Sequence, residues 1–280
     1  MSDTLRIALI QARTPATAAA GLAHVEPMIR KAAAEGARFI LTPEGVNLLE
    51  QRRDRRGEAI MDEGSDPAVV GFQALAAELG IWLLAGSVIV RSGLPGDPRA
   101  ANRSLLIDDQ GRIVSRYDKL HVFDVDLPNG ETYRESATIR PGDGAVMAGT
   151  PWGGLGLTIC YDIRFPHLYR QLAKAGVRMI AIPAAFTVPT GEAHWETLLR
   201  ARAIETGAFI LAPAQGGTHE DGRRTWGRST IVGPWGEVLA RLDHDDPGIL
   251  LATLEMTAVD RARQAIPALQ HDREFGPVPA

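Results

Sequence analysis

The only cysteine of the 280-residue chain stands where a reactive group would be useful. Cys160 lies in the stretch GLTICYDIRFPHLYRQL, between an apolar strand and a helix that begins near Pro166. A free thiol has a pKa of about 8.5, so it needs a nearby base, cation or helix N-terminus to act as a nucleophile at neutral pH. A proline at the first helical position puts a helix N-terminus close to Cys160. The competing interpretation is a small buried hydrophobic residue, a role that also suits cysteine.

Two other strand ends carry groups that complement a thiol. Glu44 follows the strand predicted for 38–41 in the motif TPEG, and Lys119 follows a strand that ends near Tyr117 in RYDKLHVFD. Strand ends can gather at one rim of a sheet. There a carboxylate would accept the thiol proton, and an ammonium would favour the thiolate and then stabilise an oxyanion. Each residue taken alone is typical of a solvated surface charge, and the spacing does not establish that the three converge.

Histidine is the usual partner of a catalytic thiol and gives an alternative. His121 lies just after Lys119, and His167 falls on the predicted helix that follows Cys160. We expect His167 to face solvent and His121 to line the same pocket without acting as the base. The histidines show no H-x-x-x-H pairing, and a single cysteine excludes an intramolecular disulfide and a thiolate-rich metal site. The expected chemistry needs no metal and no cofactor.

The elements that position these residues are predicted from apolar runs and from helix-end signals such as Pro67 and Gly80. Strands alternate with helices in the first and third quarters of the chain, and hairpins occupy the second and fourth. This order predicts an α/β fold in which two mixed β-sheets pack face to face with helices outside. The predicted helices are 17–34, 67–79, 166–174 and 194–205, and the predicted strands are 5–10, 38–41, 81–90, 104–108, 113–117, 155–160, 177–182, 208–212, 229–232, 238–242 and 249–254.

No linker or change in composition divides the chain, so we expect a single domain over 1–280, with 267–280 as an extended C-terminal tail. The stretch 118–144 contains Pro128, Gly130, Pro141 and Gly142 and is predicted to be irregular. Irregular segments of this length inside a compact domain tend to be functional.

Three stretches, TPEG, YDKLHVFD and ICYDIRFP, resemble the signature regions of the nitrilase superfamily, the carbon–nitrogen hydrolases, and the resemblance extends from Leu5 to about Phe275. It implies an α-β-β-α sandwich in which Cys160 attacks an amide carbonyl and forms a thioester. Glu44 would be the base, and Lys119 with the backbone N–H of Tyr161 would hold the oxyanion. Ammonia would leave, and water activated by Glu44 would release the acid.

A fourth stretch, YRES, places Glu135 at a second carboxylate that the superfamily keeps near the other three residues. The resemblance implies that Glu135 orients Lys119 or contacts the substrate. The competing interpretation is a surface charge in a loop.

Later segments resemble the branch that contains deaminated-glutathione amidase and omega-amidase: YRES, AFTVPTGEAHWETLLRARAIET, TWGRST and PWGEVLA. The resemblance implies an amidase for a small linear amide with a free carboxylate, with deaminated glutathione preferred. The alternatives are omega-amidase activity on α-ketoglutaramate and N-carbamoyl-amino-acid hydrolysis. The charged, glycine-rich loop 216–224 departs from the family pattern, so the resemblance does not determine the shape of the pocket.

Candidate substrate contacts follow from the neighbours of the reactive residues. A cation is needed for the substrate carboxylate, and Arg164 is a candidate, although a salt bridge with Asp162 would explain it equally well. The loop 186–191 follows a strand end and offers hydroxyl donors in the wall of the pocket. The complete set of candidate contacts is Tyr161, Arg164, Tyr133, Phe186, Thr187, Thr190 and His121.

Composition limits the other classes of function. The chain is 45% hydrophobic and 23% charged with a net charge of -4, which is typical of a globular protein and argues against nucleic acid as the main partner. No run is long enough to span a membrane, and the N-terminus lacks the apolar core of a signal peptide, so a cytoplasmic protein is expected. The family resemblance implies a homodimer. A non-catalytic binding protein and a metal phosphoesterase are the alternatives from other classes.

Overall fold

Two six-stranded mixed sheets form the centre of the structure, a computed structural model that describes residues 3–50, 52–127 and 130–276. In each sheet three parallel strands are flanked by antiparallel ones, which confirms the predicted fold class. The first sheet has the order β16 (Gly248–Glu255), β1 (Thr4–Gln11), β2 (Phe39–Leu41), β3 (Trp82–Arg91), β4 (Ala100–Ile107) and β5 (Ile113–Asp118). The second has the order β15 (Val238–Arg241), β14 (Thr230–Val232), β11 (Phe209–Ala212), β10 (Val177–Ala181), β9 (Gly153–Leu157) and β8 (Val146–Thr150).

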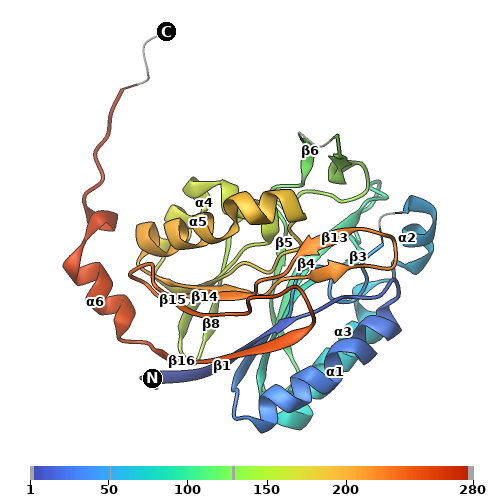
Figure 1. The fold of residues 1–280 in the computed structure, drawn as a ribbon, viewed down its shortest axis with the longest axis horizontal. Helices are drawn as coiled ribbons and strands as arrows, with labels where there is room; N and C mark the ends of the chain where they lie inside the picture. Colours follow the sequence, from blue (N-terminus) through green and yellow to red (C-terminus); the bar gives the residue numbers. More distant parts are fainter. Residues whose placement is uncertain (1–2, 51, 128–129, 277–280) are drawn as a thin grey trace.

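Helices cover the outer face of each sheet and complete a four-layer sandwich (Figure 1). α1 (Ala18–Ala34) and α3 (Pro67–Leu79) pack on the first sheet, and α4 (Pro166–Lys174) and α5 (Val188–Thr206) pack on the second. The ends of α3 follow its sequence signals, because the Asp66 side chain accepts the first free N–H groups and Gly80 closes the helix in a left-handed conformation.

The apolar pattern of β1 shows how the layers are joined. Leu5, Ile7 and Leu9 belong to the core shared with the second sheet, whereas Ala8 and Ile10 belong to the core beneath α1 and α3. Both faces of the strand are therefore buried, which explains why its sequence is a continuous apolar run without alternation.

Several short elements of three to eight residues were not predicted from the sequence, since segments this short carry too little periodicity to be identified. The region 118–144 is less irregular than expected, because it contains the hairpin of β6 and β7. The additional elements are α2 (Arg53–Ala59), α6 (Ala258–Ala265), β6 (Asp124–Asp126), β7 (Thr132–Arg134), β12 (Gly216–Thr218), β13 (Arg224–Trp226), β8 and the 3₁₀ turns Glu63–Ser65, Glu135–Ala137, Cys160–Arg164 and Ala268–Gln270.

Several predicted boundaries were wrong, among them the start of β4 at Ala100 and not at residue 104, and two of the errors lie near the proposed reactive residues. α5 begins at Val188 and not at His194, because Pro189 is accommodated in the first turn after an extended Thr187. The segment predicted as a loop, 186–191, is therefore largely the start of this helix. The strand before Cys160 ends at Leu157, and Cys160 opens the 3₁₀ turn Cys160–Arg164.

The C-terminal segment leaves the body of the molecule after α6 (Figure 1). Its first part is held on α4, where Arg170 and Lys174 pair with Asp272 and Arg170 also donates to the Ala268 carbonyl. Phe275 is 92% exposed. The last four residues of the predicted tail, 277–280, lie outside the described residues.

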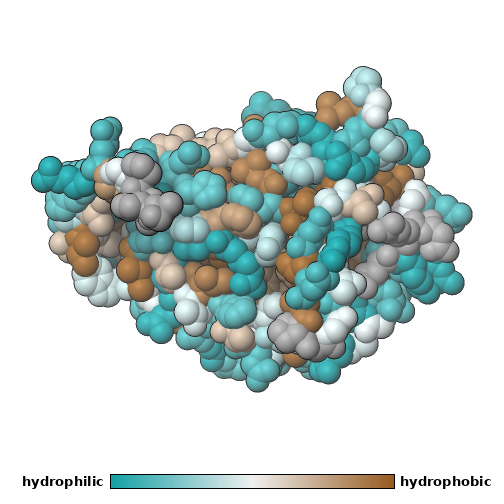
Figure 2. Space-filling model, turned by 90° about the horizontal axis from the view of Figure 1, so that it is seen from above, coloured by the Kyte–Doolittle hydropathy of each residue, from teal (hydrophilic) through white to brown (hydrophobic). Residues whose placement is uncertain are grey.

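Hydrophobic and hydrophilic residues alternate over the molecular surface. Figure 2 shows one face, on which the hydrophobic patches are separated by hydrophilic side chains. Within the described ranges, no helix combines the length and the apolar character that crossing a bilayer requires.

Gly86, at a bulge in β3, gives a test of the packing at the rim. A Cβ atom at this position would lie 1.7 Å from the Thr42 carbonyl oxygen, which follows β2 in the same sheet, and 2.6 Å from Pro183 Cβ, which follows β10 in the other sheet. We expect Gly86→Ala to lower the free energy of unfolding by about 1–3 kcal/mol or more, because the neighbouring backbone at Thr42 and the facing Pro183 must both move away. Equilibrium urea unfolding measures this change.

The matched control is Gly64→Ala, where an added Cβ would have no neighbour within 4 Å. An equally small change in both variants would show that the close approach at Gly86 does not constrain the fold.

Candidate active site

The C-terminal ends of the parallel strands of both sheets meet at one rim. The end of β1 is joined to the end of β11 by a parallel bridge between Ala12 and Gln215. β5 runs in the same direction as β2, because β4 is antiparallel to both β3 and β5. Glu44 after β2, Lys119 after β5 and Cys160 after β9 therefore leave their sheets on the same side. The carboxyl ends of parallel strands are the usual place for ligand binding in α/β folds.

A cavity of about 360 Å³ opens at this rim. Its wall includes Glu44, Lys119, Glu135 and Cys160, so the four residues singled out from the sequence as candidate catalytic groups all line one cavity. This volume is in the range of small-molecule sites.

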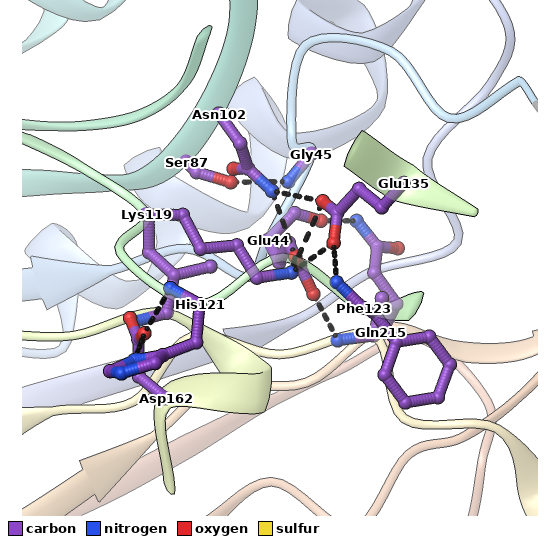
Figure 3. A network of polar contacts seen from close by, with 12 residues as sticks. Glu44, Gly45, Ser87, Asn102, Lys119, His121, Phe123, Glu135, Asp162 and Gln215 are labelled. Carbon is purple, nitrogen blue, oxygen red and sulfur yellow. Dashed lines mark hydrogen bonds and ion pairs between the residues drawn. The ribbon is translucent and has the colours of Figure 1, made fainter. Parts of the chain in front are cut away.

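Lys119 lies at the centre of a buried cluster of charges (Figure 3). Its Nζ is 2.9 Å from Glu44 Oε1 and 2.9 Å from Glu135 Oε2, and its side chain is 2% exposed. Asn102 Nδ2 donates to both carboxylates, at 2.9 Å to Glu44 and 3.3 Å to Glu135. The backbone N–H of Phe123 also donates to Glu135, at 2.6 Å. The two carboxylates are thus held on either side of one ammonium group.

The pKa values of this cluster show which groups carry charge. Burial by itself would lower the pKa of Lys119, but the charges of Glu135 and Glu44 raise it well above its ordinary value. Burial would raise the pKa of Glu44, but the Lys119 charge and hydrogen bonds from Cys160 and Lys119 hold it below its ordinary value. At neutral pH the site therefore contains an ammonium and an ionised Glu44 in mutual contact.

Cys160 occupies a strained position at the start of its turn. Its φ is +50°, a left-handed value that is uncommon outside glycine, and its N–H donates to the Pro183 carbonyl at 2.9 Å. Burial and the neighbouring Glu44 charge raise the pKa of the thiol well above its ordinary value, although Lys119 acts in the opposite direction. Cys160 therefore rests as a neutral thiol in the cavity wall that it shares with Glu44, and the thiolate suggested by the sequence is not the resting form.

Asp162 holds this turn in place. It accepts hydrogen bonds from the Ile159 N–H at 2.8 Å and from Tyr117 Oη at 2.6 Å. His121 donates to it twice, through its backbone N–H at 3.0 Å and its Nδ1 at 2.7 Å. These bonds connect the segment after β5 to the turn of Cys160, so one buried carboxylate fixes Cys160 relative to Lys119. Among the described residues, the backbone N–H of Tyr161 donates to no protein group.

Most of the predicted substrate contacts lie in the cavity wall, and one does not. Tyr161, Arg164, Tyr133, Phe186, Thr187 and Thr190 line the cavity. His121 lies outside it, because its ring stacks on Phe165 with centroids 3.5 Å apart and its Nδ1 is committed to Asp162. The Cys–His alternative fails for the same reason. Within the described chain no histidine lines the cavity beside Cys160.

Arg164 does not form the salt bridge with Asp162 that was considered from the sequence, since Asp162 is occupied by the groups described above. Its Nη2 instead lies 3.2 Å from His194 Nδ1, and its guanidinium lies over the rings of Tyr161 and Phe186. These contacts hold Arg164 in the cavity wall with its charge unneutralised by any carboxylate of the described residues.

Several cavity residues were missed by sequence reasoning. Asn102 lies in the middle of β4 and carries no motif of its own. Arg223 comes from the charged loop that was noted only as a departure from the family pattern, and Glu50 follows the TPEG motif without distinctive spacing. Only the fold brings these side chains to the rim. The one feature of the sequence that could have pointed to any of them was the unusual charge of the loop 216–224, which carries Arg223.

The described residues contain no group of three or more His, Cys, Asp or Glu side chains arranged to hold a metal ion. The polar groups of the cavity are instead suited to acyl transfer, because a thiol, an adjacent base and a positive charge surround one small space.

Comparison with known proteins gives matches over nearly the whole chain. The family model described as carbon–nitrogen hydrolase matches residues 6–264. A Yersinia enterocolitica protein named deaminated glutathione amidase is 40% identical over 268 residues, which cover 95% of this chain and 92% of the relative.

Solved structures are similar as well. The C. elegans NitFhit protein matches with a TM-score of 0.87 and 32% identity over 96% of this chain, which spans 65% of that longer protein. A variant of an amidase from Nesterenkonia sp. AN1, described as showing Michael addition of acrylamide at its active-site cysteine, matches with a TM-score of 0.76 and 26% identity over 94% of this chain and 98% of that chain.

The pH dependence of alkylation tests the resting state of Cys160. Because burial and Glu44 raise the pKa of the thiol, we expect its rate of reaction with iodoacetamide to rise continuously from about pH 6 to about pH 9. Mass spectrometry of the peptide that contains Cys160 measures the rate at each pH, with N-acetylcysteine as the unperturbed control. A rate that levels off below about pH 7 would show a resting thiolate and would contradict this assignment.

Proposed function

The chain belongs to the carbon–nitrogen hydrolase family, and we propose that it is an amidase that hydrolyses a small carboxylate-bearing amide, with deaminated glutathione as the preferred substrate. The observation that carries this proposal is that Cys160 shares the wall of one cavity with Glu44, which is itself paired with Lys119. A nucleophile, a base and a cation around one small space are the groups that acyl transfer needs.

In the first step Cys160 attacks the amide carbonyl while Glu44 takes the thiol proton. The raised pKa of the thiol and the lowered pKa of Glu44 mean that the proton moves only as the C–S bond forms. Negative charge then develops on the carbonyl oxygen, and Lys119 with the N–H of Tyr161 stabilises it. The protonated Glu44 returns the proton to the leaving nitrogen as the C–N bond breaks, which leaves a thioester on Cys160.

In the second step Glu44 removes a proton from water, which attacks the thioester carbonyl. The C–S bond breaks, and the thiolate of Cys160 recovers a proton from Glu44 as the acid departs. Glu135 acts on Lys119, because its carboxylate lies 2.9 Å from Nζ and balances the ammonium charge when Glu44 is protonated. General acid–base assistance of this kind typically contributes about 100- to 10,000-fold.

The identity of the leaving group depends on the substrate. Both nitrogen atoms of deaminated glutathione are in secondary amides, so hydrolysis of its acyl–cysteine amide releases the dipeptide cysteinylglycine and a keto-dicarboxylate. The ammonia expected from the sequence applies only to a primary amide such as α-ketoglutaramate. The two candidate substrates therefore share one acyl product and differ in the amine released.

The preference for deaminated glutathione is supported by the relatives that bear this name and by the charge of the cavity. Arg164 and Arg223 line the wall without a carboxylate partner among the described residues, so the cavity favours an anionic substrate. Tyr133, Phe186, Thr187 and Thr190 complete the wall and provide hydroxyl groups and aromatic surface. Omega-amidase activity is the first alternative, and N-carbamoyl-amino-acid hydrolysis is the second.

Product analysis separates these activities. We expect cysteinylglycine to be released from deaminated glutathione with a higher kcat/KM than ammonia from α-ketoglutaramate, and we expect rapid-quench mass spectrometry to detect an acyl group on the peptide that contains Cys160. Cys160→Ala, the control, should lower the rate at least about 1,000-fold. Faster release of ammonia would identify an omega-amidase. No turnover and no adduct with any amide would favour a non-catalytic binding protein.

We also propose that the protein is a cytoplasmic homodimer of single-domain chains, as expected from the sequence. The C-terminal segment supports an intermolecular contact, because residues 271–276 are exposed and are tied to the body of the chain by the ion pairs of Asp272 with α4, which leaves the segment able to lie across a neighbouring subunit. Sedimentation equilibrium should give twice the chain mass, and a variant that ends after Gln270 should dissociate more readily. A monomer at all concentrations would rule the dimer out.

A further inference from the structure

Asn102 is a neutral residue of β4 that is buried against the charged cluster of Figure 3. Its Nδ2 donates to Glu44 Oε1 at 2.9 Å and to Glu135 Oε1 at 3.3 Å. Lys119 Nζ donates to the same two oxygens, at 2.9 and 3.2 Å. Two donors and two acceptors therefore alternate around a closed ring of four hydrogen bonds. Asn102 completes this ring without adding a charge to it.

The ring makes the two carboxylate oxygens of Glu44 different from each other. Oε1 accepts from Asn102 and from Lys119, and a carboxylate oxygen has two lone-pair positions, so both positions of Oε1 are occupied. The backbone N–H of Ala185 donates to Oε2 at 2.9 Å and occupies one of its two positions. Oε2 therefore keeps a position for the thiol proton of Cys160.

Oε2 is also held by the sheet from which Cys160 comes. Cys160 follows β9 and Ala185 follows β10, and these two strands are neighbours in the second sheet. The Cys160 N–H donates to the carbonyl of Pro183, two residues before Ala185, at 2.9 Å. One backbone segment thus holds both the turn of Cys160 and the oxygen Oε2, whereas Oε1 is held by Asn102 and Lys119 of the first sheet.

The environment of Asn102 indicates a role beyond filling space. Its Oδ1 is buried and has no hydrogen-bond partner among the described residues. The carboxylates fix the orientation of the amide, because only its NH₂ group can donate to them. A buried oxygen without a donor costs folding free energy, and an apolar residue of similar size would avoid this cost. Departures of this kind from the rules of packing are expected at functional sites.

We propose that Asn102 is a positioning residue that directs the proton of Cys160 to Oε2 of Glu44. As the sulfur attacks the carbonyl carbon, the S–H bond breaks, its electron pair forms the C–S bond, and the proton binds Oε2. Asn102 and Lys119 together keep Oε1 from accepting this proton. The inference rests on the proposed amidase function and adds the residue that decides which oxygen of the base receives the proton.

The pH dependence of kcat/KM for deaminated glutathione tests this role, because its acid limb reports the ionisation of the base in the free enzyme. In Asn102→Leu the ionised form of Glu44 loses a donor, which raises the pKa of this group, so we expect the limb to move to higher pH. On the plateau, kcat should fall about 10- to 100-fold with KM changed by less than about threefold, because either oxygen can then take the proton. Asn102→Asp should move the limb further, since a negative charge also disfavours ionised Glu44.

The other charged groups around Glu44 are the same in all these variants. They are Lys119 after β5, Glu135 in its 3₁₀ turn, Cys160 after β9 and Arg223 in the hairpin of β12 and β13. Using one substrate throughout makes its own ionisation equal in every comparison. Near-UV circular dichroism at each pH shows the range over which a variant stays folded. A merely structural role would lower stability and activity without moving the limb.

Asn47 provides the matched control. It is also buried, and its Nδ2 also donates to a carboxylate, that of Asp66, at 3.0 Å, but it does not line the cavity. Asn47→Leu should lower the free energy of unfolding and leave the acid limb in place. Where Asn102→Leu and Asn102→Asp do not fold, Asn102→Ser replaces them. Its limb should also move to higher pH, because one hydroxyl cannot donate to two carboxylates at once.

Infrared difference titration gives the same comparison without turnover. The difference between each protein and the same protein with Glu44→Gln isolates the carboxyl bands of Glu44, whose pKa should be higher in Asn102→Leu than in the unmodified protein. An acid limb and a Glu44 pKa that both stay in place would overturn the assignment, as would an equal movement in Asn47→Leu. Failure of the unmodified enzyme with every amide would contradict the amidase function instead, and the titration would still decide whether Asn102 controls the ionisation of Glu44.

Discussion

The site depends on one buried ammonium group between two carboxylates. Isolated charges are very costly to bury, so Lys119, Glu44 and Glu135 are stable in the interior only as a cluster with matched hydrogen bonds. The cluster keeps Glu44 ionised at neutral pH, and an ionised Glu44 keeps the thiol of Cys160 protonated. The resting enzyme therefore holds an ionised base and a protonated thiol in one cavity, and no histidine of the described residues lines that cavity.

The two-sheet architecture explains how such a cluster assembles from distant segments. Each sheet contributes the C-terminal ends of parallel strands, and the sheets are joined at the same rim through Ala12 and Gln215. Asp162 then connects the turn of Cys160 to the segment that follows Lys119. The strained φ of Cys160 is maintained by these bonds, so the rigidity of the rim supports a backbone conformation that an isolated turn would not adopt.

The groups proposed to cleave the substrate and the other residues of the cavity wall come from different kinds of element. Glu44, Lys119 and Cys160 follow strand ends, where the surrounding sheet holds the backbone. Arg223 comes from the hairpin of β12 and β13. Loops and hairpins generally vary more among related proteins than the sheets they connect, so this hairpin could alter the cavity without altering the reacting groups.

The sequence by itself determined the fold class, because continuous apolar runs predict strands buried on both faces. It also indicated Glu44, Lys119 and Cys160 as candidate reactive groups, because each follows a predicted strand in a motif that resembles a known family. It did not determine the start of α5, the short hairpins, the exclusion of His121 from the cavity or the place of the loop that carries Arg223 in the cavity wall. Those features arise from contacts between residues far apart in the chain, such as His121 with Asp162 and Arg223 with Ala185. Local patterns contain no information about such contacts, and only the packing of the two sheets decides which side chains share a cavity and which charges remain unpaired.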